Sequence, residues 1–442
     1  MALDAVENSN GKGYSIAVRS NGEQFSLLDS KHGSDPFTLK AATQQAGFNA
    51  NNNQHSRKTV FILGSNAAAH YVARNAIPGI GDRRIPIDIY KTDNLAKTKS
   101  LQDKLARPEV RNQAFFEKLM INHGYHVLDH FDQRDGMLLD EHGDLRQDLQ
   151  YSPDQLARYY TSKGVQVNVI DMADPSLPEE DRDVNHPKFV DKIANDQSIG
   201  YACNIRSMQI LKPTTIAAFE NKTMHGNPTR IINAHPGEVI TYPGTNIAFW
   251  ARKNGYHENV WTLHVIDQGI DTGDVLDQVS NILKKGKTLM QDMLGMAPHA
   301  GNMIAADNRL TYQGTPRQAI PQVNHQHYAS KPANNYTFAT HQEYEDAYQQ
   351  GIRVVNPQKY IEALVLEYTG SLTSERSVAL HRSLAQATLD HQKDYLNIYQ
   401  AEYGTYPPEY DPNNPQDYFV TVPPPYQAPA NQPPHNPNPG QP

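Results

Sequence analysis

The sequence predicts an α/β protein built around a doubly wound, mostly parallel sheet. Two observations predict this fold. Six short apolar runs follow one another through the middle of the chain, and stretches with helical spacing of apolar residues separate several of them. The expected strands span residues 58–64, 85–90, 164–172, 199–205, 230–235 and 259–267. Strands that alternate with helices form parallel sheets covered on both faces, and such sheets bind ligands at the carboxyl ends of their strands.

Residues 1–57 are expected to be an accessory segment and linker. The run YSIAVRSNGEQFSLL alternates around Asn21-Gly22, which predicts a hairpin, and the Asn-rich residues 47–56 are typical of a linker. At Lys58 the polar composition gives way to KTVFILG, an apolar run that ends in glycine. The helix-like stretch SNAAAHYVARNAI follows it. The main domain is therefore expected to begin at residue 58.

The end of the chain is expected to be helical and then disordered. In NPQKYIEALVLEYTG, Asn356 can cap a helix, Pro357 suits its first position and Gly370 can end it. Residues 406–442 hold 13 of the 30 prolines, which predicts an extended, disordered tail. The expected organisation is 1–57 accessory segment, 58–331 main domain, 332–405 helical region and 406–442 Pro-rich tail.

Composition excludes several classes of protein. The length of 442 residues is too great for one ordinary core. A single cysteine, Cys203, excludes a disulfide framework and a cysteine-based zinc site, and fits a reducing compartment. No secretion signal or apolar run long enough to span a membrane is present, so we expect a cytoplasmic protein with no membrane partner. The net charge of −8 makes nucleic acid an unlikely main partner.

The stretch NAHPGEVITYPG at 233–244 carries the strongest signal for chemistry. The amide of Asn233 can donate hydrogen bonds to an oxyanion, and the imidazole of His235, two residues on along a strand, points the same way and can move a proton. Pro236 takes the chain out of the sheet at that point. Asp271, in DQGIDTGDVL after the sixth strand, can reach the same rim and orient the imidazole. Together they suit attack on a carbonyl carbon without a protein nucleophile.

Two plainer interpretations stand beside this one. An isolated Asn-x-His-Pro is most often only a strand end, and Asp-x-Gly-x-Asp-Thr-Gly is a good turn in which Asp271 caps backbone amides. His325 and His327 have the spacing of metal ligands on a strand, but no carboxylate cluster accompanies them. No metal site is therefore expected.

The motifs and their spacing resemble the catalytic core of the folate-dependent formyltransferases. Four blocks carry the resemblance in order: Asn233-Ala234-His235-Pro236, Tyr242-Pro243-Gly244, Thr262-Leu263-His264 and Asp267 through Gly273. MQILKP at 208–213 and IPQVNHQHYASK at 320–331 add weaker matches. The resemblance covers roughly residues 58–331 and implies a Rossmann-type fold. The chain departs from the family at Gly237-Glu238-Val239-Ile240 and at Gln209, near the places where donor and acceptor bind.

The resemblance implies that 10-formyltetrahydrofolate is the formyl donor and that a primary amine is the acceptor. Asn233 and protonated His235 would stabilise the oxyanion, and Asp271 would support the charged imidazole. The residues implied at the folate are Met208, Gln209, Leu211, Asp267, Gly269 and Ile270. The residues implied on the acceptor side are Ser65, Asn66, Tyr242 and Gly244. His264 is expected to be a packed strand histidine.

Several alternatives remain open for the acceptor and the partners. Residues 341–410 hold 5 basic and 10 acidic residues, a net charge of −5, which disfavours the tRNA acceptor of the methionyl-tRNA formyltransferases. An amino sugar or related small amine is the leading expectation. A 10-formyltetrahydrofolate hydrolase and a non-catalytic scaffold that works through the tail are the other candidates. Two Pro-Pro-x-Tyr segments, at 407–410 and 423–426, resemble ligands of WW domains.

Overall fold

The structure is a computed structural model that describes most of the chain between residues 57 and 427. The described ranges are 57–81, 85–93, 99–117, 164–207, 209–256, 258–283, 287–324, 335–369 and 372–427, with four short strands before residue 27 and a few isolated residues. These strands form two pairs, β1 (Val6–Glu7) with β2 (Gly13–Tyr14) and β3 (Ile16–Val18) with β4 (Gln24–Ser26). The hairpin expected around Asn21-Gly22 is therefore present, whereas residues 47–56 lie outside the described residues.

The chain divides into two compact units. The first comprises residues 1–104 and 156–354, and the second comprises residues 105–155 and 355–442. Helix α10 (His341–Gln349) belongs to the first unit because Tyr344 and Ala347 pack with Phe249 of α8 (Ile247–Lys253). The division therefore differs from the boundary at residue 331 that the sequence suggested.

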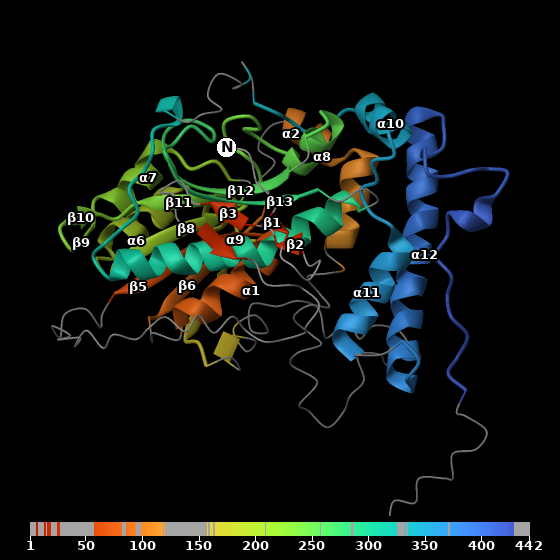
Figure 1. Cartoon of the computed structure of the whole chain (residues 1–442), viewed down its shortest axis with the longest axis horizontal. Coiled ribbons are helices and arrows are strands. Elements are labelled where there is room, and N and C mark those ends of the chain that lie inside the picture. Colours follow the sequence, from red (N-terminus) through yellow and green to blue (C-terminus); the bar gives the residue numbers. More distant parts are fainter. Residues whose placement is uncertain are drawn as a thin grey trace, which may run out of the picture. The chain divides into compact units, whose positions relative to one another are not determined.

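A seven-stranded sheet forms the centre of the first unit (Figure 1). Its strands are β5 (Lys58–Gly64), β6 (Ile87–Thr92), β7 (Val167–Asp171), β8 (Ile199–Ile205), β11 (Ile231–His235), β12 (Glu258–Val265) and β13 (Val275–Ile282), in the spatial order β13-β12-β11-β8-β5-β6-β7. The five strands from β11 to β7 are parallel, and β12 and β13 are antiparallel to their neighbours. The predicted mostly parallel α/β sheet is confirmed.

Helices cover both faces of this sheet. Helices α1 (Ala67–Gly81) and α9 (Leu289–Tyr312) pack on each other and on the strands from one side, as can be followed in Figure 1. On the other side, α6 (Pro187–Asn195) and α7 (Pro213–Glu220) bury Phe189 and Phe219 against Val60, Ile62 and Ile231. The smaller elements are α2 (Lys99–Leu105), α5 (Glu179–Arg182), β9 (Thr223–Met224), β10 (Asn227–Pro228) and η3 (Gln322–Asn324). The sheet is therefore doubly wound, as its alternating pattern predicted.

All six expected strands are present, and β13 is an additional one. Its sequence, VLDQVSNI, is interrupted by polar residues, so it lacks the continuous apolar character of the others. It lies at the edge of the sheet, and only its first three residues, 275–277, are buried, so the rest of the strand does not need apolar residues. Asp277 nevertheless lies buried within it, paired with Arg317. A buried ion pair between distant residues gives no signal in a local sequence window.

The second unit is helical, as expected. Its main elements are α11 (Pro357–Thr369) and α12 (Glu375–Tyr403), which pack on each other. Asn356 caps α11 as predicted, since its Oδ1 accepts a hydrogen bond from the backbone N–H of Lys359 at 3.1 Å. None of the described helices in either unit is both long enough and apolar enough to cross a membrane.

The expectation of a wholly disordered tail is wrong for residues 406–427. This segment contains η5 (Pro415–Asp417) and packs on α12. The buried side chain of Gln392 donates to the carbonyl of Tyr418 at 2.7 Å and accepts from the N–H of Val420 at 2.9 Å. Val420 itself is 5% exposed. Proline removes backbone donors but leaves carbonyls and tyrosine rings that can pack on a helix. Residues 428–442 lie outside the described residues.

Candidate active site

Strand β11 carries Asn233 and His235 on the same face of the sheet. Side chains alternate along a strand, so both residues share the face of Ile231, which packs under α6 and α7. Asn233 lies beside Asn204 of β8 and His264 of β12 in the pairing register. The polar residues of three adjacent strands therefore meet at one place near the carboxyl end of β11.

The loop between β12 and β13 brings Asp271 to this place. Asp271 adopts a left-handed backbone conformation, with φ of 54°. Its Oδ2 accepts a hydrogen bond from the N–H of Gly244 at 2.8 Å, and its backbone carbonyl accepts one from Gln322 Nε2 at 2.8 Å. Gln322 also donates to the carbonyl of Gly273 at 3.0 Å. Two distant segments thus hold the loop in position.

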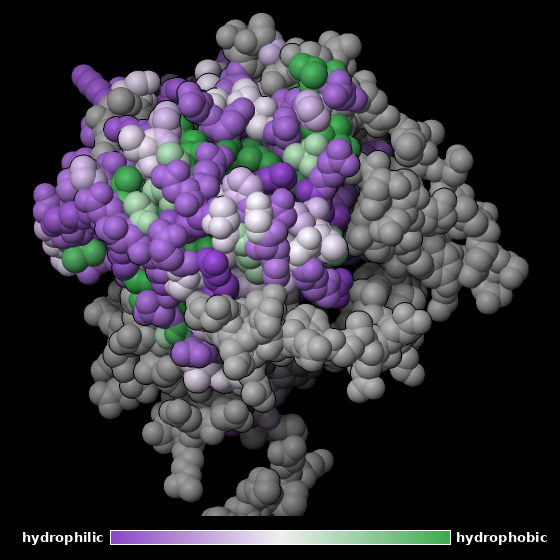
Figure 2. Space-filling view, turned by 90° about the vertical axis from the view of Figure 1, so that its left-hand side faces the viewer, coloured by the Kyte–Doolittle hydropathy of each residue, from purple (hydrophilic) through white to green (hydrophobic). Residues whose placement is uncertain are grey.

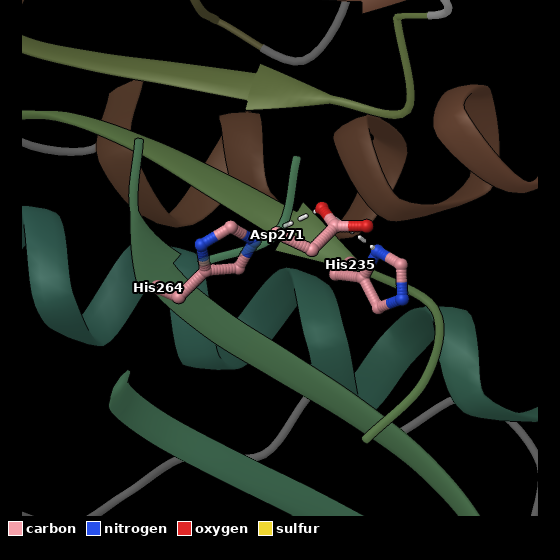
Figure 3. A group of neighbouring side chains, drawn as sticks. All are labelled: His235, His264 and Asp271. Carbon is pink, nitrogen blue, oxygen red and sulfur yellow. Dashed lines mark ion pairs between the residues drawn. The ribbon is translucent and has the colours of Figure 1, made fainter. Parts of the chain in front are cut away.

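Figure 3 shows the carboxylate of Asp271 between the rings of His235 and His264. Asp271 Oδ1 lies 3.5 Å from His235 Nδ1 and 3.6 Å from His264 Nε2. The same oxygen is 3.5 Å from Asn233 Nδ2. The structure therefore brings together Asn233, His235 and Asp271, the three residues singled out from the sequence.

The ring of His235 lies between two hydrogen-bond acceptors. Its Nδ1 faces Asp271, and its Nε2 is 3.2 Å from the backbone carbonyl of Tyr242. The neutral ring can donate to only one of these groups, whereas the protonated ring can donate to both. Burial lowers the pKa of His235, and the charge of Asp271 opposes that effect. These opposing influences suit a residue that gains and loses a proton.

Asp271 is ionised at neutral pH. Burial by itself would raise the pKa of this carboxyl group, but the neighbouring His235 and the N–H of Gly244 outweigh burial and hold the pKa below its usual range. The site therefore contains a fixed negative charge beside an imidazole. Asp271 also caps a backbone amide, as the plainer interpretation of its motif suggested, because it accepts a hydrogen bond from the N–H of Gly244.

A chain of hydrogen bonds orients the amide of Asn233. Its Oδ1 accepts from Asn204 Nδ2 at 3.0 Å, and its Nδ2 donates to His264 Nε2 at 3.0 Å. His264 Nδ1 in turn donates to the carbonyl of Val265 at 2.9 Å. His264 is buried, as expected of a strand histidine, but it also positions Asn233.

Asn204 is a site residue that the sequence reasoning missed. It is buried, and its Oδ1 has no hydrogen-bond partner among the described residues. A polar residue near the end of the otherwise apolar run IGYACNI was a signal for it. An unpartnered buried acceptor beside Asn233 is suited to a ligand that brings an N–H or O–H group.

His235, His264 and Asp271 also have the spacing of a metal site. Each offers one ligand atom, and these atoms lie within 4.8 Å of one another. The lone pair of His264 Nε2, which a metal ion would need, already accepts the hydrogen bond from Asn233. The arrangement therefore fits acid–base chemistry better than metal ligation. His325 and His327 lie outside the described residues.

The residues implied at the folate are in varied surroundings. Asp267, Gly269 and Ile270 are exposed on the loop that carries Asp271. The side chain of Gln209 is instead buried and bonded to backbone groups of Asp93, Arg182 and Val184, so it holds the chain rather than facing a ligand. Leu211 packs in the core, and Met208 lies outside the described residues.

The residues implied on the acceptor side are also engaged in the fold. Ser65 Oγ donates to the carbonyl of Thr92 at 2.7 Å, and Asn66 caps α1 by accepting from the N–H of Ala69 at 3.0 Å. Tyr242 is buried, and its carbonyl faces His235. The N–H of Gly244 faces Asp271. The last two thus contact the catalytic candidates directly.

The similarities of this chain to known proteins are similarities of structure. No family model matches the chain. The structure is similar to a phosphoribosylglycinamide formyltransferase from Bacillus halodurans, with 14% identity, 58% of this chain and 94% of that chain covered, and a TM-score of 0.34. It is similar to a sugar N-formyltransferase from Shewanella, with 11% identity, 74% and 88% covered, and a TM-score of 0.35.

A third similar structure is the N-formyltransferase from Helicobacter canadensis in complex with folinic acid and dTDP-3-aminofucose. The two chains share 12% identity, and the match covers 79% of this chain and 83% of that chain with a TM-score of 0.33. TM-scores of this size do not carry a functional argument. The side chains of this chain, and not these similarities, are therefore the basis for assigning a reaction.

Proposed function

We propose that this chain transfers a formyl group from 10-formyltetrahydrofolate to a primary amine of a small acceptor. The observation that carries the proposal is the meeting of Asn233, His235 and Asp271, from two separate segments, with Asp271 Oδ1 within 3.5 Å of both partners. An amide donor, an ionisable imidazole and a fixed carboxylate suit acyl transfer that uses no protein nucleophile.

Three features of the structure fit a bound donor and acceptor. Asn233, His235 and Asp271 are here called the triad. Beside them lies Asn204 Oδ1, a buried acceptor that has no partner among the described residues and is suited to an N–H of a ligand. Ile270 on the Asp271 loop is 43% exposed, and Ile210 on the segment after β8 is 64% exposed. Exposed apolar side chains on the two segments implied at the folate suit contact with an aromatic ring system.

In this reaction the donor supplies an electrophilic formyl carbon to the acceptor amine. Asn233 donates its second amide N–H, the one that does not bond His264, to the carbonyl oxygen as negative charge builds up there. His235 accepts the proton that the amine loses and returns it to the nitrogen that leaves the formyl group. Asp271 stabilises the imidazolium in between, because it is ionised and 3.5 Å from Nδ1.

Among acceptors we propose an amino sugar or a related small amine. The C-terminal residues 341–410 carry a net charge of −5, which opposes the phosphates of a tRNA. The described part of the second unit consists of helices and the packed tail segment. Neither feature offers the cationic surface that a tRNA acceptor needs.

The experiment is an amine screen with 10-formyltetrahydrofolate that measures tetrahydrofolate, formylated product and formate. Purified chain is expected to release tetrahydrofolate with an amine, and His235→Gln is expected to reduce the rate by about 10²-fold or more. His341→Gln, on α10 away from the triad, is the matched control and should keep its rate. Formate without formylated product would instead assign hydrolysis, and equal activity of His235→Gln and the parent would refute the role of the triad.

We also propose that residues 423–426, rather than 407–410, are available to a WW-type partner. Pro407 is buried, and the ring of Tyr410 packs on Tyr406 and Tyr418. Pro424 and Pro425 are exposed. Isothermal titration with a WW domain should show binding that Tyr426→Ala abolishes and Tyr410→Ala leaves unchanged. Equal loss in both variants would contradict this assignment.

A further inference from the structure

A second polar site lies on the other face of the sheet from the triad. Tyr201 and Ile232 point to the α9 side, because they alternate with Ala202 and Ile231, which pack under α6 and α7. Together with Asp307 of α9 and Arg317 beyond it, they line a pocket of about 40 Å³, here named the Arg317 pocket. The remaining lining comes from residues of the β9–β10 hairpin, β13 and the end of α9, including Thr229, Arg230, Leu276 and Thr311.

Three buried polar atoms of this pocket have no hydrogen-bond partner among the described residues. Two are Nη2 and Nε of Arg317, on a side chain that is 8% exposed, and the third is Thr229 Oγ1, on a residue that is 3% exposed. Buried donors without partners are rare in folded proteins because nothing replaces the hydrogen bonds that they lose to water. Their meeting at one pocket indicates that something else completes their hydrogen bonds.

Two carboxylates lie beside Nη1 and Nε of Arg317. Nη1 lies 2.9 Å from Asp277 Oδ2, and Nε lies 3.3 Å from Asp307 Oδ1. Asp307 Oδ2 also accepts a hydrogen bond from the hydroxyl of Tyr201 at 3.1 Å. The two carboxylates hold the guanidinium in place, and its unpartnered N–H groups are free to donate to a further acceptor.

We propose that the Arg317 pocket binds a small planar oxyanion of the carboxylate class through Arg317 Nη2 and the hydroxyl of Thr229, with Arg230 at its exposed rim. The volume fits three or four heavy atoms, since a water needs about 10–15 Å³ of such space. Formate, bicarbonate and acetate have this size. The face that carries the β9–β10 hairpin, turned to the viewer in Figure 2, is largely hydrophilic, as entry of an ion requires.

Charge in the pocket depends on Asp307. With Asp307 ionised, Arg317 and Arg230 balance Asp277 and Asp307, and with Asp307 protonated the four groups carry a net charge of +1. Burial is the main reason that the pKa of Asp307 is raised to about 6, while Arg317 and the Tyr201 hydroxyl oppose it. Cys203, buried two residues after Tyr201 on β8, is neutral because burial raises its pKa well above the usual value. Anion affinity should therefore increase as the pH falls through 6.

The test is a titration of the full chain with ¹³C-formate at constant ionic strength, followed by the NMR line width of formate. Thr229→Val, which keeps the shape and removes the hydroxyl, should weaken binding about tenfold. Thr223→Val is the matched control, since Thr223 lies exposed on β9 and does not line the pocket. It should bind formate like the parent chain.

Asp307→Asn supplies a gain of binding that a misfolded chain could not produce. It retains an acceptor for Tyr201 and removes the negative charge, so formate should bind about tenfold more tightly at pH 7.5 and without dependence on pH near 6. Absence of formate binding, or equal effects of Thr229→Val and Thr223→Val, would overturn the proposal. Formyl transfer serves as an independent readout, because none of these variants contacts the triad.

Discussion

Replacing Asp271 with asparagine separates the charge of this residue from its role in holding the loop. The asparagine carbonyl oxygen can still accept from the N–H of Gly244, so the backbone should keep its position. The change removes one negative charge 3.5 Å from His235 Nδ1. Burial then acts on the imidazole without opposition, and the pKa of His235 should fall further.

The size of the effect follows from the distance. Two unit charges 3.5 Å apart interact by about 4–5 kcal/mol at an effective dielectric constant of 20. If the imidazolium forms during formyl transfer, loss of most of that interaction should reduce the rate about 10²- to 10³-fold. Binding of the acceptor amine should change much less, because Asp271 acts on the histidine.

Two measurements check this expectation. NMR titration of ¹³C-labelled histidine rings should show His235 titrating at lower pH in Asp271→Asn than in the parent chain. Tetrahydrofolate release should fall in the same variant. Asp274→Asn removes the same charge from the same loop but outside the histidine cluster, and it should leave both readouts unchanged. A His235 titration that stays in place in Asp271→Asn would refute the coupling.

Three further predictions concern other parts of the chain. Because the pKa of Asp307 is raised to about 6, the folded chain holds this proton more tightly than the unfolded chain, so the free energy of unfolding should fall by about 2 kcal/mol as the pH rises from 4 to 6. Urea unfolding of Asp307→Asn should lack this slope, and an unchanged slope would contradict the prediction. Gly244→Ala should destabilise the chain by about 3 kcal/mol or more, since φ is 110° and a Cβ would lie 2.2 Å from the Tyr336 carbonyl oxygen. Gly255→Ala, with φ of 73° and open space around the Cβ, should cost only about 1 kcal/mol in the same assay, and equal losses would show that backbone conformation alone matters. Gln392→Ala should expose the tail and speed its limited proteolysis about 30-fold, from the loss of two hydrogen bonds of about 1 kcal/mol each, whereas Gln386→Ala, on the exposed side of α12, should not.

Much of the fold could be predicted because each inner strand is a recognisable apolar run in the sequence. Buried parallel strands need apolar residues on both faces, and β5 and β8 show that pattern over seven residues each. Strand β13 does not, because it lies at the edge and keeps Asp277 buried through Arg317, 40 positions away. Packing of the tail on α12 escaped prediction for the same reason, since it depends on Gln392 and not on the tail's own composition.

Asn233, His235 and Asp271 could be predicted because the motifs that contain them follow one another at a characteristic spacing along the chain. The residues that orient them could not be predicted in this way. Asn204 and His264 act on Asn233 through hydrogen bonds across the sheet, and no spacing along the chain reveals such contacts. One signal was nevertheless present. Each of these residues is a polar interruption of a buried strand, and a buried polar residue is retained only where a partner meets it. Asn204, whose Oδ1 has no partner among the described residues, is therefore the residue of this strand region at which a ligand is most to be expected.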